Sequence, residues 1–134
     1  MNIRLAEEKD MKELCFYDKH IDKNELLSVI RLNRIFIVEE KDTFIGWLRY
    51  GLFWDNTPFM NMLYVLDSRR NKGYGKRLVE HWEKEMKSLG YTTVLTSTQS
   101  NEYSQHFYVK LGYKTIGGFL LEPESFEIIL TKKL

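Results

Sequence analysis

The segment with the clearest chemistry in this sequence is a short basic and glycine-containing run, residues 69–77. It holds five basic residues and no acidic one, with Gly73 and Gly75 at alternate positions. An amphipathic stretch that predicts a helix follows directly, and the first N–H groups of a helix have no internal partner and lie at its positive end. Glycine also lets a ligand approach the backbone closely. The run therefore predicts a site for an anion such as phosphate.

Two well-known phosphate-binding patterns do not fit this segment. A Walker P-loop needs Gly-Lys followed by Ser or Thr, and the dinucleotide-binding fingerprint needs a third glycine early in the fold. Gly-x-Gly alone is a weak signal, and a glycine-containing turn with solvated Lys and Arg side chains is the alternative interpretation of residues 69–77.

A second group of polar residues recurs at helical spacing. Asn101, Ser104 and Tyr108 fall on one face of a helix predicted over residues 101–111, beside an apolar stripe that begins at Tyr103. A tyrosine hydroxyl is protonated at neutral pH and can donate a proton to a leaving group. Two alternatives stay open, because Asn101 fits an N-cap as well as a ligand contact and Tyr108 fits a hydrophobic core.

Both segments resemble motifs of one known family. The run Arg70-x-x-Gly73-x-Gly75 is similar to the Arg/Gln-x-x-Gly-x-Gly/Ala signature of the GCN5-related N-acetyltransferases (GNAT). The run from Asn101 to Tyr113 is similar to that family's second motif, usually Asn-x-x-Ala-x-x-Phe-Tyr-x-x-x-Gly-Phe. Two motifs in the right order, with a strand between them, are far more specific than either alone.

The resemblance implies an enzyme that transfers an acetyl or other acyl group from acetyl-CoA to a primary amine. In the family, backbone groups of the fourth strand hold the pantetheine arm, and the N–H groups of the loop hold the pyrophosphate. The implied cofactor-binding residues are Leu63, Val65, Arg70, Asn71, Lys72, Gly73, Tyr74, Gly75 and Lys76, together with Asn101 and Ser104. Most of the loop residues would act through their backbone.

The family analogy gives Tyr108 the role of general acid to the coenzyme A thiolate, with direct attack by the amine and no covalent enzyme intermediate. Backbone N–H near Val65 could stabilise the oxyanion. The family often has a Glu early in the fourth strand as base, but residues 59–62 hold no carboxylate and Asp55 is the nearest acid, so no base is assigned. Alternative functions are a non-catalytic acyl-CoA-binding or regulatory module and a small nucleotide-binding protein.

Hydrophobic periodicity and turn residues predict an α/β (α+β) chain of one domain over residues 1–134. The expected fold is a GNAT-like mixed, mostly antiparallel seven-stranded sheet flanked by about four helices, in the order β-α-α-β-β-β-α-β-α-β-β. The strands are expected at residues 3–6, 34–40, 44–54, 59–66, 92–97, 113–121 and 126–131, and the helices at 7–18, 22–32, 74–89 and 101–111. The strand at 59–66, mostly apolar, is expected to be buried on both faces.

Composition limits the other function classes. Lys and Arg total 20 against 19 for Asp and Glu, so the chain lacks the basic excess of a dedicated nucleic-acid binder. The one cysteine, Cys15, cannot form an internal disulfide or a multi-cysteine zinc site, and no metal is expected. The chain begins without an apolar signal segment and has no run long enough to span a membrane, so we expect a cytoplasmic location and no membrane partner.

The acceptor is expected to be a small molecule or peptide with an amine, and the sequence does not identify it. Trp47, Tyr50, Phe53 and Trp54 are candidates to line its pocket, although Trp47 fits the core equally well. The two final strands carry several large apolar residues and could form the contact of a homodimer.

Overall fold

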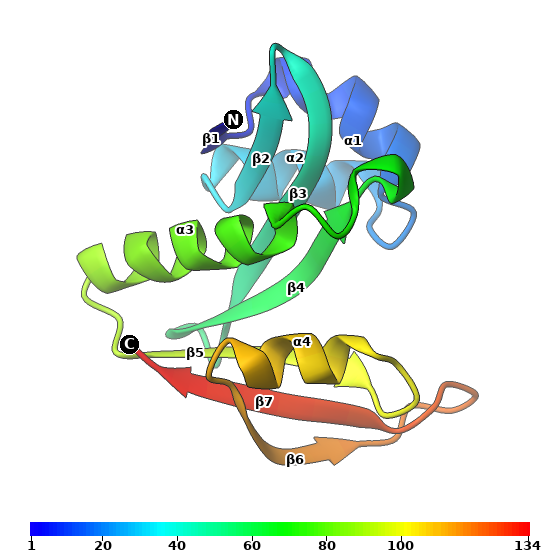
Figure 1. Ribbon diagram of the computed structural model, residues 1–134, viewed down its shortest axis with the longest axis vertical. Helices are drawn as coiled ribbons and strands as arrows, with labels where there is room; N and C mark the ends of the chain where they lie inside the picture. The colour runs from blue at the N-terminus through cyan, green and yellow to red at the C-terminus, as the bar shows by residue number, and fades with distance from the viewer. The chain divides into compact units, whose positions relative to one another are not determined.

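The protein has seven strands in one sheet and four α-helices, described over residues 1–134 in a computed structural model (Figure 1). The strands are β1 (Asn2–Leu5), β2 (Ile35–Glu40), β3 (Thr43–Phe53), β4 (Thr57–Val65), β5 (Thr93–Gln99), β6 (Lys114–Phe119) and β7 (Glu127–Lys133). The helices are α1 (Met11–Tyr17), α2 (Lys23–Arg31), α3 (Tyr74–Ser88) and α4 (Ser104–Lys110). The strand order is β1-β2-β3-β4-β5-β7-β6, and β4 and β5 are the parallel pair that the strand–helix–strand pattern predicts. The predicted order of elements and the mixed sheet are confirmed.

Charge pairing explains why the first predicted helix is shorter than expected. A 3-10 turn, η1 (Glu8–Asp10), precedes α1. The Asp10 carboxylate accepts hydrogen bonds from Nη1 and Nη2 of Arg4 on β1 at 2.8 and 2.9 Å, and from the Glu7 N–H at 2.7 Å. The Arg4 guanidinium holds the pKa of Asp10 below its usual value. The turn is therefore fixed to β1 by a charged anchor, which the helical periodicity does not reveal.

The chain divides into two compact units. The first comprises Met1–Gly51 and Met62–His81, and the second comprises Leu52–Asn61 and Trp82–Leu134. Strand β4 and helix α3 each contribute one segment to each unit.

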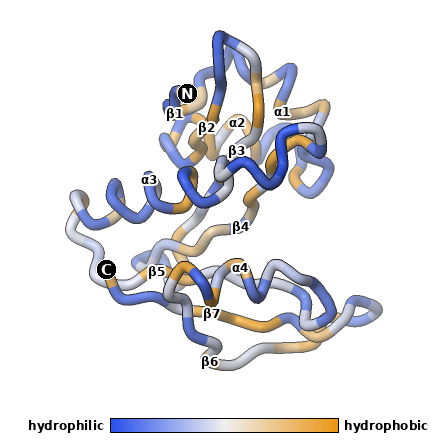
Figure 2. Tube along the Cα trace, viewed as in Figure 1, coloured by the Kyte–Doolittle hydropathy of each residue, from blue (hydrophilic) through white to orange (hydrophobic).

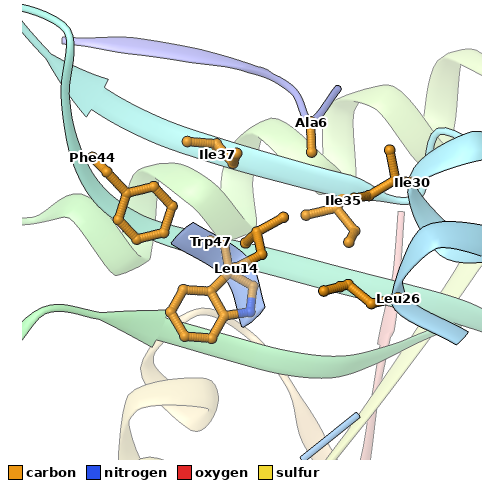
Figure 3. Close-up of a cluster of buried hydrophobic side chains, with 8 residues drawn as sticks. All are labelled: Ala6, Leu14, Leu26, Ile30, Ile35, Ile37, Phe44 and Trp47. Atoms are coloured by element: carbon orange, nitrogen blue, oxygen red, sulfur yellow. The ribbon is translucent and has the colours of Figure 1, made fainter. Parts of the chain in front are cut away.

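In the first unit, β2 has helices on both of its faces. Ile35 and Ile37 point to one side, where they pack with Leu14 of α1 and Leu26 of α2 (Figure 3). Phe36 points to the opposite side, because side chains alternate along a strand. Its ring meets the ring of His81 of α3 edge to face at 5.0 Å. His81 is half-buried there.

The amphipathic helix predicted after the basic run is α3, and its apolar face is buried over most of its length. Leu78, Trp82 and Met86 are fully buried, as residues three or four apart on one helix face can be. Leu89 is 65% exposed, however, because the helix ends at Ser88 and the next residue no longer keeps the helical spacing.

In the second unit, β5 lies between a parallel and an antiparallel neighbour. Phe59 and Met60 of β4 pair with Leu95 and Thr96, and β7 pairs with β5 over the whole of that strand. The Thr96 hydroxyl donates to the Met60 carbonyl at 3.1 Å. Figure 2 shows the middle of β7 as strongly hydrophobic and β6 as pale. All of β6 is exposed, and it lies at the end of the strand order.

Strand β4 is less buried than its composition suggests. Asn61 is exposed, and the four residues from Met62 to Val65 are only half-buried. The expectation of a strand buried on both faces is therefore wrong, and the accessible part is the part that leads into the glycine-containing loop.

Gly46 sets how closely β3 approaches β4. A Cβ atom at this position would lie 2.3 Å from the Tyr64 carbonyl oxygen and 3.0 Å from the Val65 Cα. Both neighbours are backbone atoms, so they cannot rotate away.

We predict that Gly46→Ala destabilises the protein by about 1–3 kcal/mol through overpacking, net of the small gain from a less flexible unfolded chain. Chemical denaturation followed by circular dichroism would measure this. Thr43→Ala, at an exposed position on the same strand, is the control and should change stability by less than about 0.5 kcal/mol. Equal effects of the two substitutions would contradict the close approach.

Candidate active site

The basic segment forms an exposed loop that ends in the first turn of α3. The loop follows a 3-10 turn, η2 (Asp67–Arg69), and Asn71 and Gly73 have left-handed backbone angles, with φ of 61° and 88°. The Arg77 N–H donates to the Gly73 carbonyl at 3.1 Å in the first bond of the helix. The N–H groups of the three residues before Arg77 therefore have no carbonyl acceptor within the helix, and they are available to an anion.

The side chain of Arg70 braces the start of this loop. Its Nε donates to the Val65 carbonyl at 2.9 Å, and its Nη1 lies 3.0 Å from the Asp67 carboxylate. Its guanidinium also lies over the ring of Tyr64, 4.9 Å from the centroid. Arg70 thus joins the loop to the end of β4.

The end of the loop has a second anchor, on β2. The Tyr74 hydroxyl donates to Oε2 of Glu40, and Nη1 of Arg69 lies 3.9 Å from the same oxygen. The hydrogen bond raises the pKa of Tyr74 and lowers the pKa of Glu40. No local sequence pattern predicts this contact, because residues 34 positions apart on different elements form it.

In the second unit, Tyr108 is the buried residue of α4. Its hydroxyl lies 3.9 Å from the Met60 Sδ, and burial raises its pKa to about 12, against a partly opposing hydrogen bond with Thr96. Its ring meets the ring of Tyr113 edge to face at 5.6 Å. The phenol is therefore held in one place and is protonated over the whole physiological pH range.

The predicted start of this helix is wrong by three residues. Helix α4 begins at Ser104, its N-cap is Tyr103, and Asn101 lies in the preceding turn as an exposed residue. The N-cap interpretation of Asn101 is therefore wrong. The predicted apolar stripe is wrong at its first residue, because the Tyr103 ring is 89% exposed, whereas Phe107 and Leu111 are half-buried.

Ser104 has a partner within the second unit. Its hydroxyl shares a hydrogen bond with the hydroxyl of Thr98 on β5. This bond fixes the first turn of α4 to the sheet and so helps to set the position of Tyr108, one turn further along the helix.

Tyr113 stands where the family motif usually has Phe, and its additional hydroxyl is satisfied. It donates to Oε2 of Glu83 on α3 at 2.8 Å, and Nζ of Lys132 lies 2.9 Å from the other carboxylate oxygen. Burial, followed by the charge of Glu83, raises the pKa of Tyr113. From the sequence, only the Tyr in place of the motif's Phe could have indicated a nearby acceptor, because a buried hydroxyl needs a hydrogen-bond partner.

Trp47 belongs to the core of the first unit. It is 1% exposed, and its Nε1 donates to Oδ2 of Asp18 at 3.2 Å. Arg49 Nε binds the same oxygen at 2.7 Å, so this buried carboxylate is both paired and hydrogen-bonded. Of the two interpretations of Trp47, the structure shows the core one.

The other three aromatic residues considered for the acceptor pocket differ in how exposed they are. Tyr50 is 6% exposed and stacks with Phe36, whereas Phe53 and Trp54 are 42% and 79% exposed and lie side by side with a centroid distance of 4.9 Å. Phe53 and Trp54 are thus the accessible members of this set.

No cluster of three or more His, Cys, Asp or Glu residues could hold a metal ion, and none of the helices is long and apolar enough to span a bilayer.

The fold is that of known acetyltransferases. A GNAT-family acetyltransferase from Bacillus cereus ATCC 10987 has a TM-score of 0.80 at 25% identity, over 98% of this chain and 96% of that one. The ribosomal-protein-S18-alanine N-acetyltransferase from Escherichia coli has a TM-score of 0.82 at 15% identity, over 98% and 92% of the two chains. An aminoglycoside 6'-N-acetyltransferase complexed with coenzyme A has a TM-score of 0.80 at 20% identity, over 99% and 97%.

The sequence agrees with the fold. The model of the acetyltransferase (GNAT) family matches residues 4–113, and the chain belongs to that family. The prediction of an acetyl-CoA-dependent N-acetyltransferase is confirmed at this level. The match includes both the glycine-containing loop and the Tyr108 helix.

We predict that Gly73→Ala raises the dissociation constant for acetyl-CoA by about tenfold or more, because a side chain strains the left-handed loop that presents the N–H groups. Isothermal titration calorimetry would measure the change. Gly90→Ala is a matched control, since Gly90 also has a left-handed φ, of 97°, and nothing lies within 4 Å of an added Cβ at either glycine. An equal loss of affinity in both variants would mean that general instability is the cause.

Proposed function

We propose that the protein transfers the acetyl group of acetyl-CoA directly to a primary amine, with the Tyr108 hydroxyl as the hydrogen-bond donor to the leaving sulfur. The observation that carries the proposal is the environment of Tyr108: its hydroxyl is buried, protonated, held by packing on Tyr113, and lies next to a thioether sulfur of the protein, Met60 Sδ. A thiolate is a stronger acceptor than a thioether, so the same hydroxyl suits the leaving group.

Coenzyme binding is assigned to the loop and to the half-buried end of β4. The backbone of Leu63 and Val65 would hold the pantetheine arm, and the N–H groups from Asn71 to Lys76 the pyrophosphate. Lys72 and Lys76 are exposed and add positive charge without a fixed partner, which suits a polyphosphate. Arg70 contributes mainly by bracing the loop, because its guanidinium is already bound to Val65 and Asp67.

The second motif contributes in two different ways. The side chain of Asn101 is exposed and can pair with an amide of pantetheine. The Ser104 hydroxyl is bonded to Thr98, so Ser104 acts by fixing α4 in place.

In the proposed reaction, a neutral amine attacks the thioester carbonyl and the Val65 N–H stabilises the oxyanion. The tetrahedral intermediate then collapses, the C–S bond breaks, and the proton of the attacking nitrogen passes to solvent water, which leaves the amide and the coenzyme A thiolate. A phenol of pKa about 12 is a weaker acid than a thiol of pKa about 8.5. Tyr108 therefore donates a hydrogen bond to the developing thiolate, and the released ammonium proton balances the charge.

The proposal assigns neither the residue that deprotonates the amine nor the identity of the acceptor. Early β4 offers no carboxylate, and His106 is exposed with its ring against Tyr103. The two related folds above act on a ribosomal protein and on an aminoglycoside, so the fold does not select an acceptor. The homodimer also stays a prediction, supported by a fully exposed edge strand. The exposed apolar residues there are Ile116, Phe119, Leu120, Leu121 and Phe126.

We predict that Tyr108→Phe lowers kcat by about 10²–10³-fold, the usual loss when one preorganised hydrogen-bond donor to a developing charge is removed, and changes the KM for acetyl-CoA little. Stopped assays of thiol release would measure both constants. Tyr103→Phe is the control, because Tyr103 is on the same segment but 89% exposed. Since the pKa of Tyr108 is about 12, wild-type kcat should show no alkaline decline from this group up to about pH 10. Unchanged kcat in Tyr108→Phe would remove Tyr108 from the reaction.

An acceptor screen with thiol-release detection separates the enzyme from a non-catalytic coenzyme-binding module. We expect acetyl-CoA to raise the melting temperature more than ATP does, since ligands that bind the folded state stabilise it. At least one primary amine should then give thiol release above hydrolysis. Binding of acetyl-CoA without any transfer would favour the non-catalytic module, and protection by ATP alone would overturn both coenzyme hypotheses.

A further inference from the structure

We propose that Glu40 and Tyr74 are positioning residues for the coenzyme's pyrophosphate. The inference rests on the proposed function, and it concerns side chains outside the backbone contacts that the motif implies. Glu40 is the last residue of β2, and Tyr74 is the first residue of α3.

One carboxylate holds both ends of the loop. Oε2 of Glu40 accepts the hydrogen bond of the Tyr74 hydroxyl, directly after the loop, and lies 3.9 Å from Nη1 of Arg69, directly before it. Oε1 lies 4.0 Å from the N-terminal amine of Met1. The segment between the two anchors is only four residues long, and Asn71 and Gly73 within it have left-handed backbone angles.

The loop depends on such anchors because little else holds it. Asn71, Lys72 and Gly73 are exposed, and a short exposed loop with left-handed residues has many competing conformations. Fixing its ends reduces the entropy that is lost when a ligand binds, which strengthens binding without a new contact to the ligand. The Arg70 brace on Val65 fixes the strand side of the loop, and Glu40 adds the connection to β2.

Geometry and charge act in opposite directions at Glu40. The hydrogen bond to Tyr74 favours an ordered loop, whereas a carboxylate close to a pyrophosphate repels it. Glutamine retains a carbonyl acceptor for Tyr74 and removes the negative charge. Phenylalanine at position 74 removes the donor and leaves the charge in place. These two substitutions therefore separate the two effects.

We expect Tyr74→Phe to raise the dissociation constant and the KM for acetyl-CoA by about three- to tenfold, the range of a single hydrogen bond. We expect kcat at saturating acetyl-CoA to fall by less than about twofold, since the bond acts on binding rather than on chemistry. Glu40→Gln should lose less affinity than Tyr74→Phe, because the lost repulsion offsets a weaker bond. The effect of the double variant should be smaller than the sum of the two, because both residues act through one bond.

A donor without phosphates distinguishes positioning from a general structural effect. S-acetylpantetheine carries the thioester and the pantetheine arm but no pyrophosphate, so its kcat/KM should change by less than about twofold in Tyr74→Phe. Glu8→Gln is the matched control for the loss of a surface carboxylate, since Glu8 pairs with Arg31 at 3.3 Å elsewhere on the first unit. It should leave the KM for acetyl-CoA unchanged.

The outcomes are distinguishable from failure of the proposed function. If the wild type shows neither acetyl-CoA binding nor thiol release, the proposed function is wrong. If the wild type is active and Tyr74→Phe keeps its affinity for acetyl-CoA, the positioning role is wrong. Equal losses with acetyl-CoA and S-acetylpantetheine would also overturn it, because they would show a general effect on the fold.

Discussion

The unpaired N–H groups at the start of α3 are the constraint around which the first unit is organised. A helix always leaves its first donors without internal partners, and here they must be both accessible and fixed. Gly73 makes them accessible by taking a left-handed backbone angle of 88° with no neighbouring atom above it. Arg70 and Glu40 fix them from either side, one by bonding to the end of β4 and the other by bonding to Tyr74. The close approach of β3 at Gly46 holds β4 itself in place.

In the second unit, burial determines the protonation state of Tyr108. The hydroxyl of Tyr108 is withdrawn from water, which raises its pKa and keeps it protonated. Tyr113 supports the ring, and its own hydroxyl is bound by Glu83 and thereby linked to Lys132. A phenol in this position is a poor source of a free proton but a reliable hydrogen-bond donor, which is the property that stabilises a leaving thiolate.

Several of the buried and half-buried carboxylates bind other side chains. Asp10 binds Arg4, Asp18 binds Arg49 and Trp47, and Glu83 binds Tyr113. For Asp10, the hydrogen bonds from Arg4 stabilise the charged form and lower the pKa, so this carboxylate is a poor base.

Local patterns in the sequence determined the order of strands and helices, the basic loop with its glycines, and the presence of the Tyr108 helix. Each of these features depends on residues within about ten neighbouring positions: a glycine in a turn, apolar residues at helical spacing, or a run of basic residues. Such local features can be recognised without knowledge of the fold. The tertiary structure decided the rest. The start of α4 at Ser104, the burial of Trp47 and the half-burial of His81 depend on what packs against each residue. The bonds from Glu40 to Tyr74 and from Glu83 to Tyr113 join residues about 30 positions apart, and a long-range pair of polar side chains leaves no periodicity from which it could be predicted.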